Sequence, residues 1–234
     1  MVSLREGLML EGGGVVSLVG GGGKTSLMFN LARELSMVGE TVLTTTTTKI
    51  LEPSRDQTSC VILSGAVPNI LDRADGLLDK HPHLTAAVGK LPESDKLYGF
   101  RPEIIGELWN AGLFQWIIVE ADGAAGKPLK APVGHEPVIP ACTKRLVGMV
   151  GMNGVGQPLT ERLVFRHEHF ARLTGLGFGS NVTESAIADV LIRDNGLFKG
   201  FCPEVMRIVF LNQADVRDNF SAGKRISRIL SERI

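Results

Sequence analysis

Residues 15–39 constrain the fold of this 234-residue chain more than any other segment. They read VVSLVGGGGKTSLMFNLARELSMVG, in which a β-branched run is followed by four glycines and then by apolar residues at helical spacing. The apolar run predicts a strand at 15–19 that is buried on both faces of a parallel sheet. The residues from Thr25 onward predict an amphipathic helix that ends at Gly39.

The same alternation of strand and helix continues along the chain. Further strands are expected at 41–48, 60–63, 85–89, 114–123, 144–151 and 206–215, and helical stretches at 102–112, 160–197 and 223–234. This order predicts an α/β fold with a mainly parallel sheet flanked by helices. The simplest organisation is one domain over residues 1–234, with a mostly helical insertion around 155–200. The chain stops inside a predicted helix, which leaves the completeness of its C-terminus open.

The four glycines and the residues that follow them form a candidate phosphate-binding loop. Such a loop needs inward-pointing N–H groups, backbone angles that glycine adopts cheaply, and a helix whose positive end faces the anion. Lys24 would reach the β- and γ-phosphates of a nucleotide, and the Thr25 hydroxyl would ligate Mg²⁺. The expected nucleotide-binding residues here are Gly20, Gly21, Gly22, Gly23, Lys24, Thr25 and Ser26. A flexible glycine turn with a solvated lysine is the alternative.

The spacing of this loop is unusual. Leu18 stands where the first glycine of G-x-x-x-x-G-K-[ST] would be, so GGGGKT fits the shorter pattern G-x-x-G-K-[ST] instead. That shorter pattern is similar to the loop of Mur-type ligases.

A second candidate site follows the apolar run WIIVEADG, which resembles a Walker B strand. Glu120 and Asp122 are two residues apart, so in an extended strand both carboxylates point the same way. Asp122 is expected to hold the metal, and Glu120 to orient the attacking water or hold the metal itself. The alternative is a strand exit whose acids cap the next turn. In the Gly- and Pro-rich loop that follows, Lys127 and Lys130 either bind the γ-phosphate or a substrate anion, or are solvated.

A third motif, NQAD, follows the predicted strand MRIVFL. Asn212 and Asp215 match the Asn-Lys-x-Asp motif with which GTPases bind guanine, whereas Gln213 replaces its lysine. A bidentate contact from the Asp215 carboxylate would discriminate against adenine. Asp215 could instead be the N-cap of the following helix. The choice between GTP and ATP therefore stays open.

The threonine run at 44–48 ends the second predicted strand. One hydroxyl, that of Thr46 or Thr47, could complete the coordination of Mg²⁺ or sense the γ-phosphate. Because side chains alternate between faces, most of these threonines are expected to be structural.

Charge and cysteine content exclude several classes of function. The chain has 25 basic and 25 acidic residues, which gives no global field for nucleic acid or an anionic membrane. Cys60, Cys142 and Cys202 are far apart and odd in number, so they suggest neither a disulfide framework nor a metal knuckle. The first fourteen residues lack the basic start and apolar run of a signal peptide. A cytoplasmic protein is expected, with no membrane or nucleic-acid partner and an unspecified oligomeric state.

Several segments together resemble the YqeC-like family, which is described as accessory to selenium-dependent molybdenum hydroxylases. These segments are residues 15–50, KLYGFRPE at 96–103, VEADGAAGKPLKAPVGHEPVIP at 119–140, 156–176, 196–200 and 209–215. The resemblance implies a three-layer P-loop NTPase fold and a role in maturing a molybdenum hydroxylase or its cofactor. It carries over to Gly20–Thr25, to Glu120–Lys130, and to Asn212 and Asp215.

The function expected from these motifs is Mg²⁺-dependent binding and hydrolysis of ATP or GTP, in a protein that assists a molybdenum hydroxylase or handles a molybdenum-cofactor intermediate. In that reaction Lys24, Glu120 and Asp122 would be the catalytic residues, and Thr25, Asp122 and Glu120 would hold the metal. A Mur-like ligase or small-molecule kinase is one alternative, and a non-catalytic, nucleotide-gated binding module is another.

Overall fold

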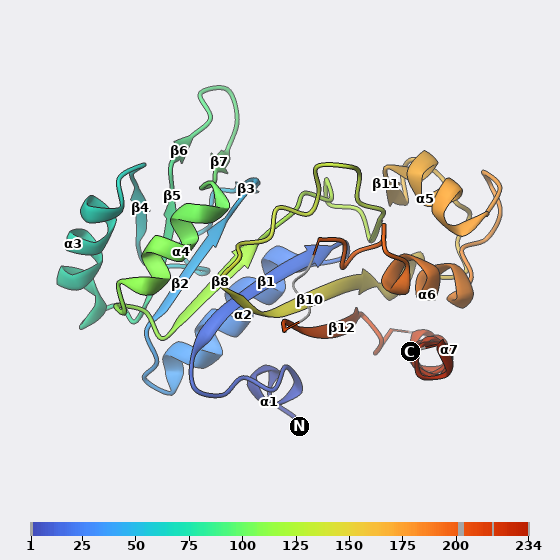
Figure 1. Ribbon diagram of the computed structural model, residues 1–234, viewed down its shortest axis with the longest axis horizontal. Coiled ribbons are helices and arrows are strands. Elements are labelled where there is room, and N and C mark those ends of the chain that lie inside the picture. Colours follow the sequence, from blue (N-terminus) through green and yellow to red (C-terminus); the bar gives the residue numbers. More distant parts are fainter. Residues whose placement is uncertain (1, 201–203, 217, 234) are drawn as a thin grey trace.

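The computed structural model describes residues 2–200, 204–216 and 218–233, and a seven-stranded sheet forms its centre (Figure 1). The strands are β1 (Gly14–Gly20), β2 (Val42–Thr46), β4 (Val61–Leu63), β5 (His83–Ala87), β8 (Trp116–Glu120), β10 (Thr143–Gly151) and β12 (Met206–Asn212). Their order across the sheet is β12-β10-β1-β8-β2-β5-β4, and each neighbouring pair is parallel. The carboxyl ends of all these strands therefore meet at one edge, where ligands commonly bind in such folds.

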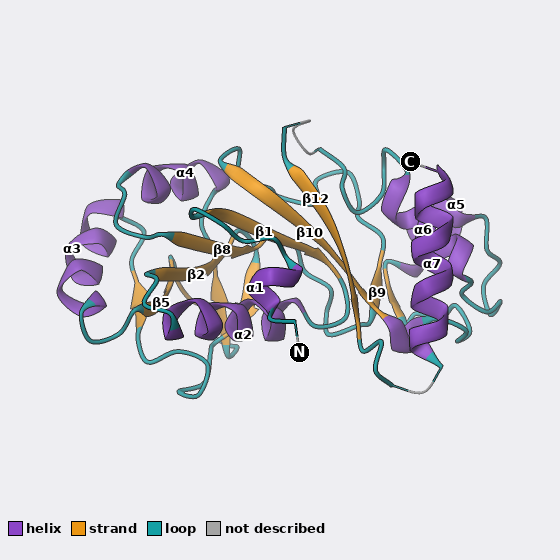
Figure 2. Ribbon diagram, turned by 90° about the horizontal axis from the view of Figure 1, so that it is seen from below, coloured by secondary structure: helices purple, strands orange, loops and turns teal. Residues whose placement is uncertain are grey.

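Helices cover both faces of this sheet (Figure 2). α1 (Leu4–Gly7) and α2 (Lys24–Met37) lie on one face, while α3 (Val67–Leu78) and α4 (Pro102–Asn110) lie on the other. The molecule is thus a three-layer, P-loop-like α/β fold, and the predicted fold class is confirmed.

The central strand β1 shows why the sheet needs both layers. Val16 and Leu18 belong to the same apolar cluster as Met28 of α2. Val15 and Val19 point to the opposite face and belong to the cluster that contains α3 and α4 residues. Because alternate side chains of one strand are buried on opposite faces, its sequence is a continuous apolar run rather than an alternating one.

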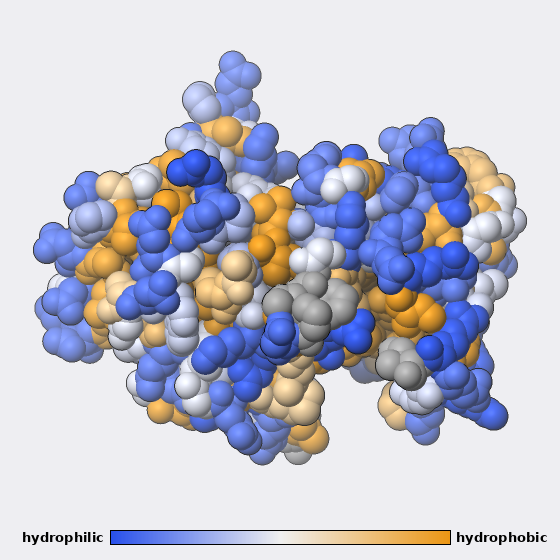
Figure 3. Space-filling model, in the orientation of Figure 1, coloured by the Kyte–Doolittle hydropathy of each residue, from blue (hydrophilic) through white to orange (hydrophobic). Residues whose placement is uncertain are grey.

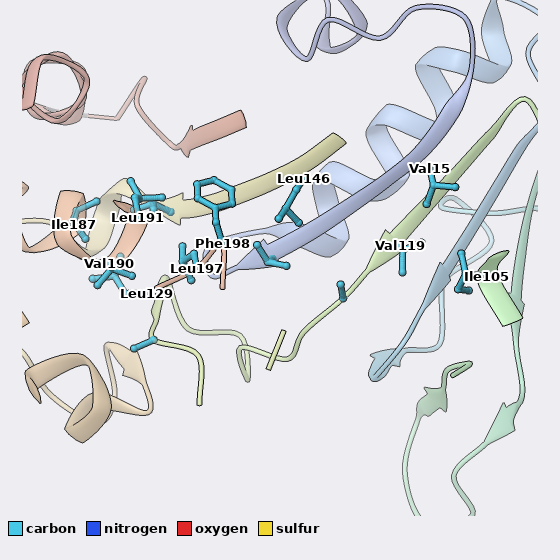
Figure 4. Packing of buried hydrophobic residues seen from close by; sticks show 14 of the residues in the cluster. Val15, Ile105, Val119, Leu129, Leu146, Ile187, Val190, Leu191, Leu197 and Phe198 are labelled. Carbon is cyan, nitrogen blue, oxygen red and sulfur yellow. The ribbon is translucent and has the colours of Figure 1, made fainter. Parts of the chain in front are cut away.

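A second group of helices lies beyond the β12–β10 side of the sheet (Figure 1). It consists of α5 (His167–Thr174), α6 (Glu184–Ile192) and α7 (Asn219–Arg233). Figure 4 shows Ile187 and Leu191 of α6 near Leu197, in the same buried cluster as Val15 at the far end of β1. The apolar core is therefore continuous between the sheet and these helices.

Short strands complete the fold. β3 (Lys49–Leu51), β7 (Lys96–Tyr98) and β6 (Gly89–Lys90) form an antiparallel sheet, and the tip of the β6–β7 hairpin projects as a hydrophilic knob (Figure 3). β9 (Leu129–Lys130) pairs in parallel with β11 (Val164–Phe165) and so joins the segment after β8 to the one before α5. A 3₁₀ turn, η1 (Met152–Gly154), follows β10.

The main elements lie close to where the sequence predicts them, with differences at several boundaries. β2 ends at Thr46 and β12 at Asn212, each before the end of the predicted strand. The 160–197 stretch contains α5 and α6 separated by turns, since Gly175 adopts a left-handed conformation that ends α5. The apolar periodicity of α3 was missed, and α7 begins at Asn219, ahead of the predicted 223.

The sequence also led to expectations about the cysteines, the C-terminus and membrane-spanning segments. Cys202 and Ile234 lie outside the described residues. Cys60 and Cys142 are free thiols. Among the described residues, no helix is both long enough and apolar enough to cross a membrane.

Candidate functional site

The glycine loop, residues 20–23, connects the carboxyl end of β1 to the first turn of α2. Gly20, Gly22 and Gly23 have φ angles of 97°, 81° and 113°, a region that disfavours side chains. A Cβ on Gly22 would lie 2.4 Å from the backbone of Gly151, and one on Gly21 would lie 2.9 Å from two carbonyl oxygens. Close packing and backbone conformation therefore both require the four glycines.

Two neighbouring segments hold the glycine loop. The Gly21 N–H donates to the Met149 carbonyl and the Gly22 N–H to the Lys127 carbonyl, both at 3.0 Å. The Gly20 N–H donates to Oδ2 of Asp122 at 3.0 Å. By contrast, no side chain among the described residues caps the amino end of α2, so its first-turn N–H groups have no side-chain acceptor there. Such a helix end attracts an anion.

Lys24 lies behind the loop, with its side chain 3% exposed. Its ammonium donates to the Gly20 carbonyl at 2.5 Å and lies 3.0 Å from Oδ1 of Asp122 and 3.8 Å from Oε1 of Glu120. The Thr25 hydroxyl donates to Oε2 of Glu120 at 2.6 Å. The structure therefore brings together the loop lysine, the loop threonine and both acids at the end of β8.

The two acids have different surroundings. Burial raises the pKa of the Glu120 carboxyl above its ordinary value, although Lys24 and the Thr25 hydroxyl act in the opposite direction. Asp122 is fully buried and bonds through Oδ2. Its Oδ1 is close to Lys24 but has no hydrogen bond of good geometry from the described residues. Oδ1 is thus ion-paired with Lys24, and it keeps the capacity to accept a further hydrogen bond or ligand.

The Lys130 side chain is fully buried in contact with Asp122 rather than exposed to a ligand. Its ammonium lies 3.1 Å from Oδ2 of Asp122 and 3.0 Å from Oε2 of Glu136, and it donates to the Gly123 carbonyl at 2.5 Å. Nζ of Lys130 therefore has an acceptor for each of its N–H groups. Its positive charge offsets the negative charge of Asp122.

Glu136 continues this set of ion pairs toward the second group of helices. Arg166, the residue before α5, donates from Nε and Nη2 to the Glu136 carboxylate at 3.2 and 3.4 Å. Burial alone would raise the pKa of Glu136, but Lys130 and Arg166 outweigh it and hold that pKa below its ordinary value. We call Lys24, Glu120, Asp122, Lys130, Glu136 and Arg166 the charge cluster.

Lys127 has a different position from the other lysine of its loop. Its backbone carbonyl supports Gly22, but its ammonium donates to the Glu161 carbonyl and lies 5.8 Å from the centre of the Phe165 ring. Lys127 is therefore directed toward the segment before α5, and its predicted contact with a phosphate stays a prediction.

The NQAD motif lies next to the glycine loop through its asparagine. Nδ2 of Asn212 donates to the Gly22 carbonyl at 2.7 Å, and its Oδ1 accepts from the Gln213 N–H at 3.0 Å. Gln213 has a φ of 63°, which turns the chain sharply after β12. Asp215 is exposed and α7 begins only at Asn219, so Asp215 is not the residue that precedes this helix.

The threonines of β2 are bonded within the sheet. The Thr45 hydroxyl donates to the Ala86 carbonyl at 2.8 Å, and the Thr46 hydroxyl donates to the Glu120 carbonyl at 2.7 Å. The Thr47 hydroxyl donates to the Val138 carbonyl at 2.8 Å. The structure thus gives Thr46 and Thr47 structural roles beside the charge cluster.

The residues present are compatible with Mg²⁺ held jointly with a phosphate. Within the described ranges, no group of three or more His, Cys, Asp or Glu side chains could hold a metal by itself. The donor set consists of the Thr25 hydroxyl, the Glu120 carboxylate and Oδ1 of Asp122, all of them oxygens. Mg²⁺ prefers oxygen ligands and usually retains waters or phosphate oxygens beside one or two carboxylates.

Glu136 and Arg166 are the site residues that sequence reasoning missed. Neither residue belongs to a sequence motif of known chemistry, and 30 positions separate them along the chain. The only local signal is that Glu136 belongs to the same Gly- and Pro-rich segment as Lys130.

Comparison with known proteins gives a family match. The family model described as "YqeC protein" matches residues 16–168, which include the glycine loop and the acids of β8. A protein named "Uncharacterized protein YqeC" from Escherichia coli (strain K12) is 32% identical over 223 residues, covering 93% of this chain and 83% of that protein. No solved structure matches the chain.

Proposed function

The chain belongs to the YqeC protein family, and on that premise we propose that it is a Mg²⁺-dependent nucleotide-binding and hydrolysing protein. The observation that carries this proposal is the convergence of GGGGKT with Glu120 and Asp122. Lys24 lies within 3.8 Å of both carboxylates, and the uncapped amino end of α2 follows the same loop. A helix amino end, a lysine and an acid-supported hydroxyl together suit a nucleotide's phosphates.

The residues divide the work in a definite way. The first-turn N–H groups of α2 and the Lys24 ammonium would bind phosphate oxygens and stabilise the charge that develops on them during transfer. Thr25 and Asp122 would hold Mg²⁺, which when bound offsets negative charge on the phosphates. Glu120 would orient the attacking water and accept its proton, a role that a carboxyl with a raised pKa suits.

The proposed client is a molybdenum hydroxylase or an intermediate of its cofactor. Support for this part comes from the resemblance of residues 119–140 and the other segments named above to a family described as accessory to selenium-dependent hydroxylases. Nucleotide state would then control contact with the client.

The test of nucleotide binding is a Lys24→Ala variant titrated with ATP and GTP analogues in the presence of Mg²⁺. Tight binding by the parent protein should be lost in the variant, whereas Lys49→Ala, which alters an exposed lysine of β3, should bind as the parent does. Because Lys24 is buried among acids, thermal unfolding must show that the variant is folded. Equal affinity in parent and Lys24→Ala would refute the proposal.

A ligase or small-molecule kinase is a second candidate, favoured by the short G-x-x-G-K-[ST] spacing of Gly20–Thr25. It predicts negligible hydrolysis by the protein alone and transfer that begins when an acceptor such as a pterin is added. Binding with no turnover, even with the client present, would instead identify a non-catalytic, nucleotide-gated module.

A further inference from the structure

The charge cluster reaches out of the sheet and into the segment that carries α5. Asp122 and Lys130 follow β8, whereas Arg166 comes from the turn between β11 and α5. Glu136 lies between them, since its Oε2 is 3.0 Å from Lys130 and 3.2 Å from Arg166. The chain of contacts is therefore Asp122, Lys130, Glu136 and Arg166, in that order.

We propose that Glu136 and Arg166 are positioning residues for the loop site, and that they act on Asp122 through Lys130. This inference rests on the proposed function, because Asp122 matters as a support for Mg²⁺ only if a nucleotide binds at the loop. It assigns part of residues 155–200 to the nucleotide site itself.

Lys130 is buried together with its two carboxylate partners. Its side chain and that of Asp122 are 0% exposed, and the Glu136 side chain is 9% exposed. In such surroundings an ammonium group is held by its partners rather than by water, and the loss of one partner strengthens its pairing with the others. The strength of the ion pair between Lys130 and Asp122 therefore depends on whether Glu136 also binds the ammonium.

The formal charges of the charge cluster balance. The charge cluster contains three cations and three carboxylates. Arg166 supplies the third cation, so without it the remaining buried groups would carry one excess negative charge. Without Glu136 they would carry one excess positive charge. Loss of Arg166 therefore makes the electrostatic potential at Asp122 more negative, and loss of Glu136 makes it more positive.

The backbone at Arg166 has an unusual conformation. This residue has φ 62° and ψ 49°, a left-handed conformation that is uncommon for a residue with a side chain. Its guanidinium also lies 4.9 Å from the centre of the Phe165 ring. A strained backbone conformation persists where contacts with the surrounding structure hold it in place. For Arg166 these contacts are with the Glu136 carboxylate and the Phe165 ring.

Removal of the Glu136 charge and removal of the Arg166 charge should therefore have opposite effects on Mg²⁺ binding. In Glu136→Gln, Lys130 has Asp122 as its remaining carboxylate partner, so Asp122 is neutralised more and should support Mg²⁺ less well. In Arg166→Gln, Glu136 loses its other partner and competes more strongly for Lys130, so Asp122 should support Mg²⁺ better. The double variant removes one charge of each sign and should resemble the parent.

The experiment measures the Mg²⁺ concentration at half-maximal binding of a non-hydrolysable nucleotide analogue. We expect about a threefold to tenfold rise for Glu136→Gln, a fall of about threefold for Arg166→Gln, and a value within about twofold of the parent for the double variant. Arg172→Gln, a change at an exposed arginine of α5, the helix that follows Arg166, is the matched control and should not shift the value. Arg166→Lys should restore part of the parent behaviour because it keeps the charge.

A merely structural role makes a different prediction. Both single variants would then weaken binding in parallel with a lower unfolding temperature, and the double variant would be weaker still; that pattern overturns the inference. Should one single variant fail to fold, the other single variant still decides. A shift of its Mg²⁺ midpoint in the predicted direction that the double variant reverses supports the inference, and an unshifted midpoint, or a double variant no closer to the parent, overturns it. Absence of nucleotide binding by the parent refutes the proposed function and this inference together. Parent binding that is lost in Lys24→Ala but unshifted by changes at 136 and 166 refutes only the inference.

Discussion

One polar cluster is buried within the sheet and a second begins at the end of β8, and the two differ in kind. The threonine cluster consists of Thr44, Thr45, Thr46, His83 and Thr85 from β2 and β5. Its polar groups are bonded within the sheet: the Thr44 hydroxyl, for example, lies 2.7 Å from that of Thr85 and 3.0 Å from Nε2 of His83. The charge cluster lies beside it at the end of β8 and carries full charges, with Oδ1 of Asp122 lacking a good hydrogen bond from the described residues.

The difference separates structure from proposed function. A neutral cluster whose threonine hydroxyls are hydrogen-bonded to one another, to His83 or to strand carbonyls stabilises the strands without a ligand. Five of the six charges of the charge cluster are buried, and Arg166 is 32% exposed. Buried charges are costly to desolvate and add little net stability compared with apolar packing. Such an arrangement is typical of sites that a charged ligand completes. The comparison therefore predicts that changes in the two clusters will affect different measurements.

The largest expected effect is that of Asp122→Asn. The change leaves Lys24 and Lys130 buried with one carboxylate fewer, and should cost about 3 kcal/mol or more in the free energy of unfolding. It should also weaken Mg²⁺-dependent nucleotide binding by about tenfold to a hundredfold. Urea unfolding and analogue titration measure the two effects.

Thr45→Val is the matched control from the threonine cluster. It removes one buried hydrogen bond, to the Ala86 carbonyl, and should cost about 1–3 kcal/mol of stability with no change in nucleotide affinity. If Thr45→Val impaired nucleotide binding as much as Asp122→Asn does, the distinction between the two clusters would fail.

The second prediction concerns pH and tests the neutral state of the threonine cluster. Burial lowers the pKa of His83 from 6.5 to about 4. Because the unfolded chain takes up this proton first, the stability that His83 contributes is complete above pH 6.5 and is lost as the pH falls toward 4. The loss through this one group should be about 3 kcal/mol.

A His83→Gln variant isolates that contribution. The free energy of unfolding is measured between pH 7 and pH 4.5 for both proteins, and the difference between them should shrink steadily as the pH falls. Parallel curves would show that His83 is not held neutral by its burial beside Thr44 and Phe29.

The sequence predicted the parts of the site that local patterns determine. The β1–loop–α2 unit follows from residues 15–39, because apolar periodicity and a run of glycines act over short distances. The pairing of Glu120 and Asp122 with Lys24 follows in outline, since parallel strands place their carboxyl ends at one edge. These features depend on few contacts between distant segments.

The rest depended on packing that sequence patterns do not encode. Lys130 looked like a ligand for an anion, yet it is buried between Asp122 and Glu136, because the loop after β8 folds back and pairs through β9 with β11. The four glycines were explained by their conformation alone, whereas Gly21 and Gly22 also need to be small because of backbone contacts with 127–128 and Gly151. Helix α3 is a different case, because its helical spacing is present in the sequence, with Ile70 and Ala74 one turn apart, and that pattern was overlooked.

The smallest expected effect on stability is that of Asp215→Ala, which should sharpen the comparison by changing binding alone. Asp215 is exposed and lies in the turn between β12 and α7, so its loss should change the free energy of unfolding by no more than about 0.5 kcal/mol. Asn212, three residues earlier, is bonded to the Gly22 carbonyl, which places this turn beside the proposed phosphate site.

If Asp215 accepts the guanine edge, the parent should prefer GTP analogues, and Asp215→Ala should lose that preference. The variant should keep the same Mg²⁺ dependence, because the charge cluster is untouched. A preference for ATP analogues in the parent would reject the guanine interpretation of NQAD and would leave Asn212 with the role that its bond to Gly22 indicates, namely to hold the glycine loop.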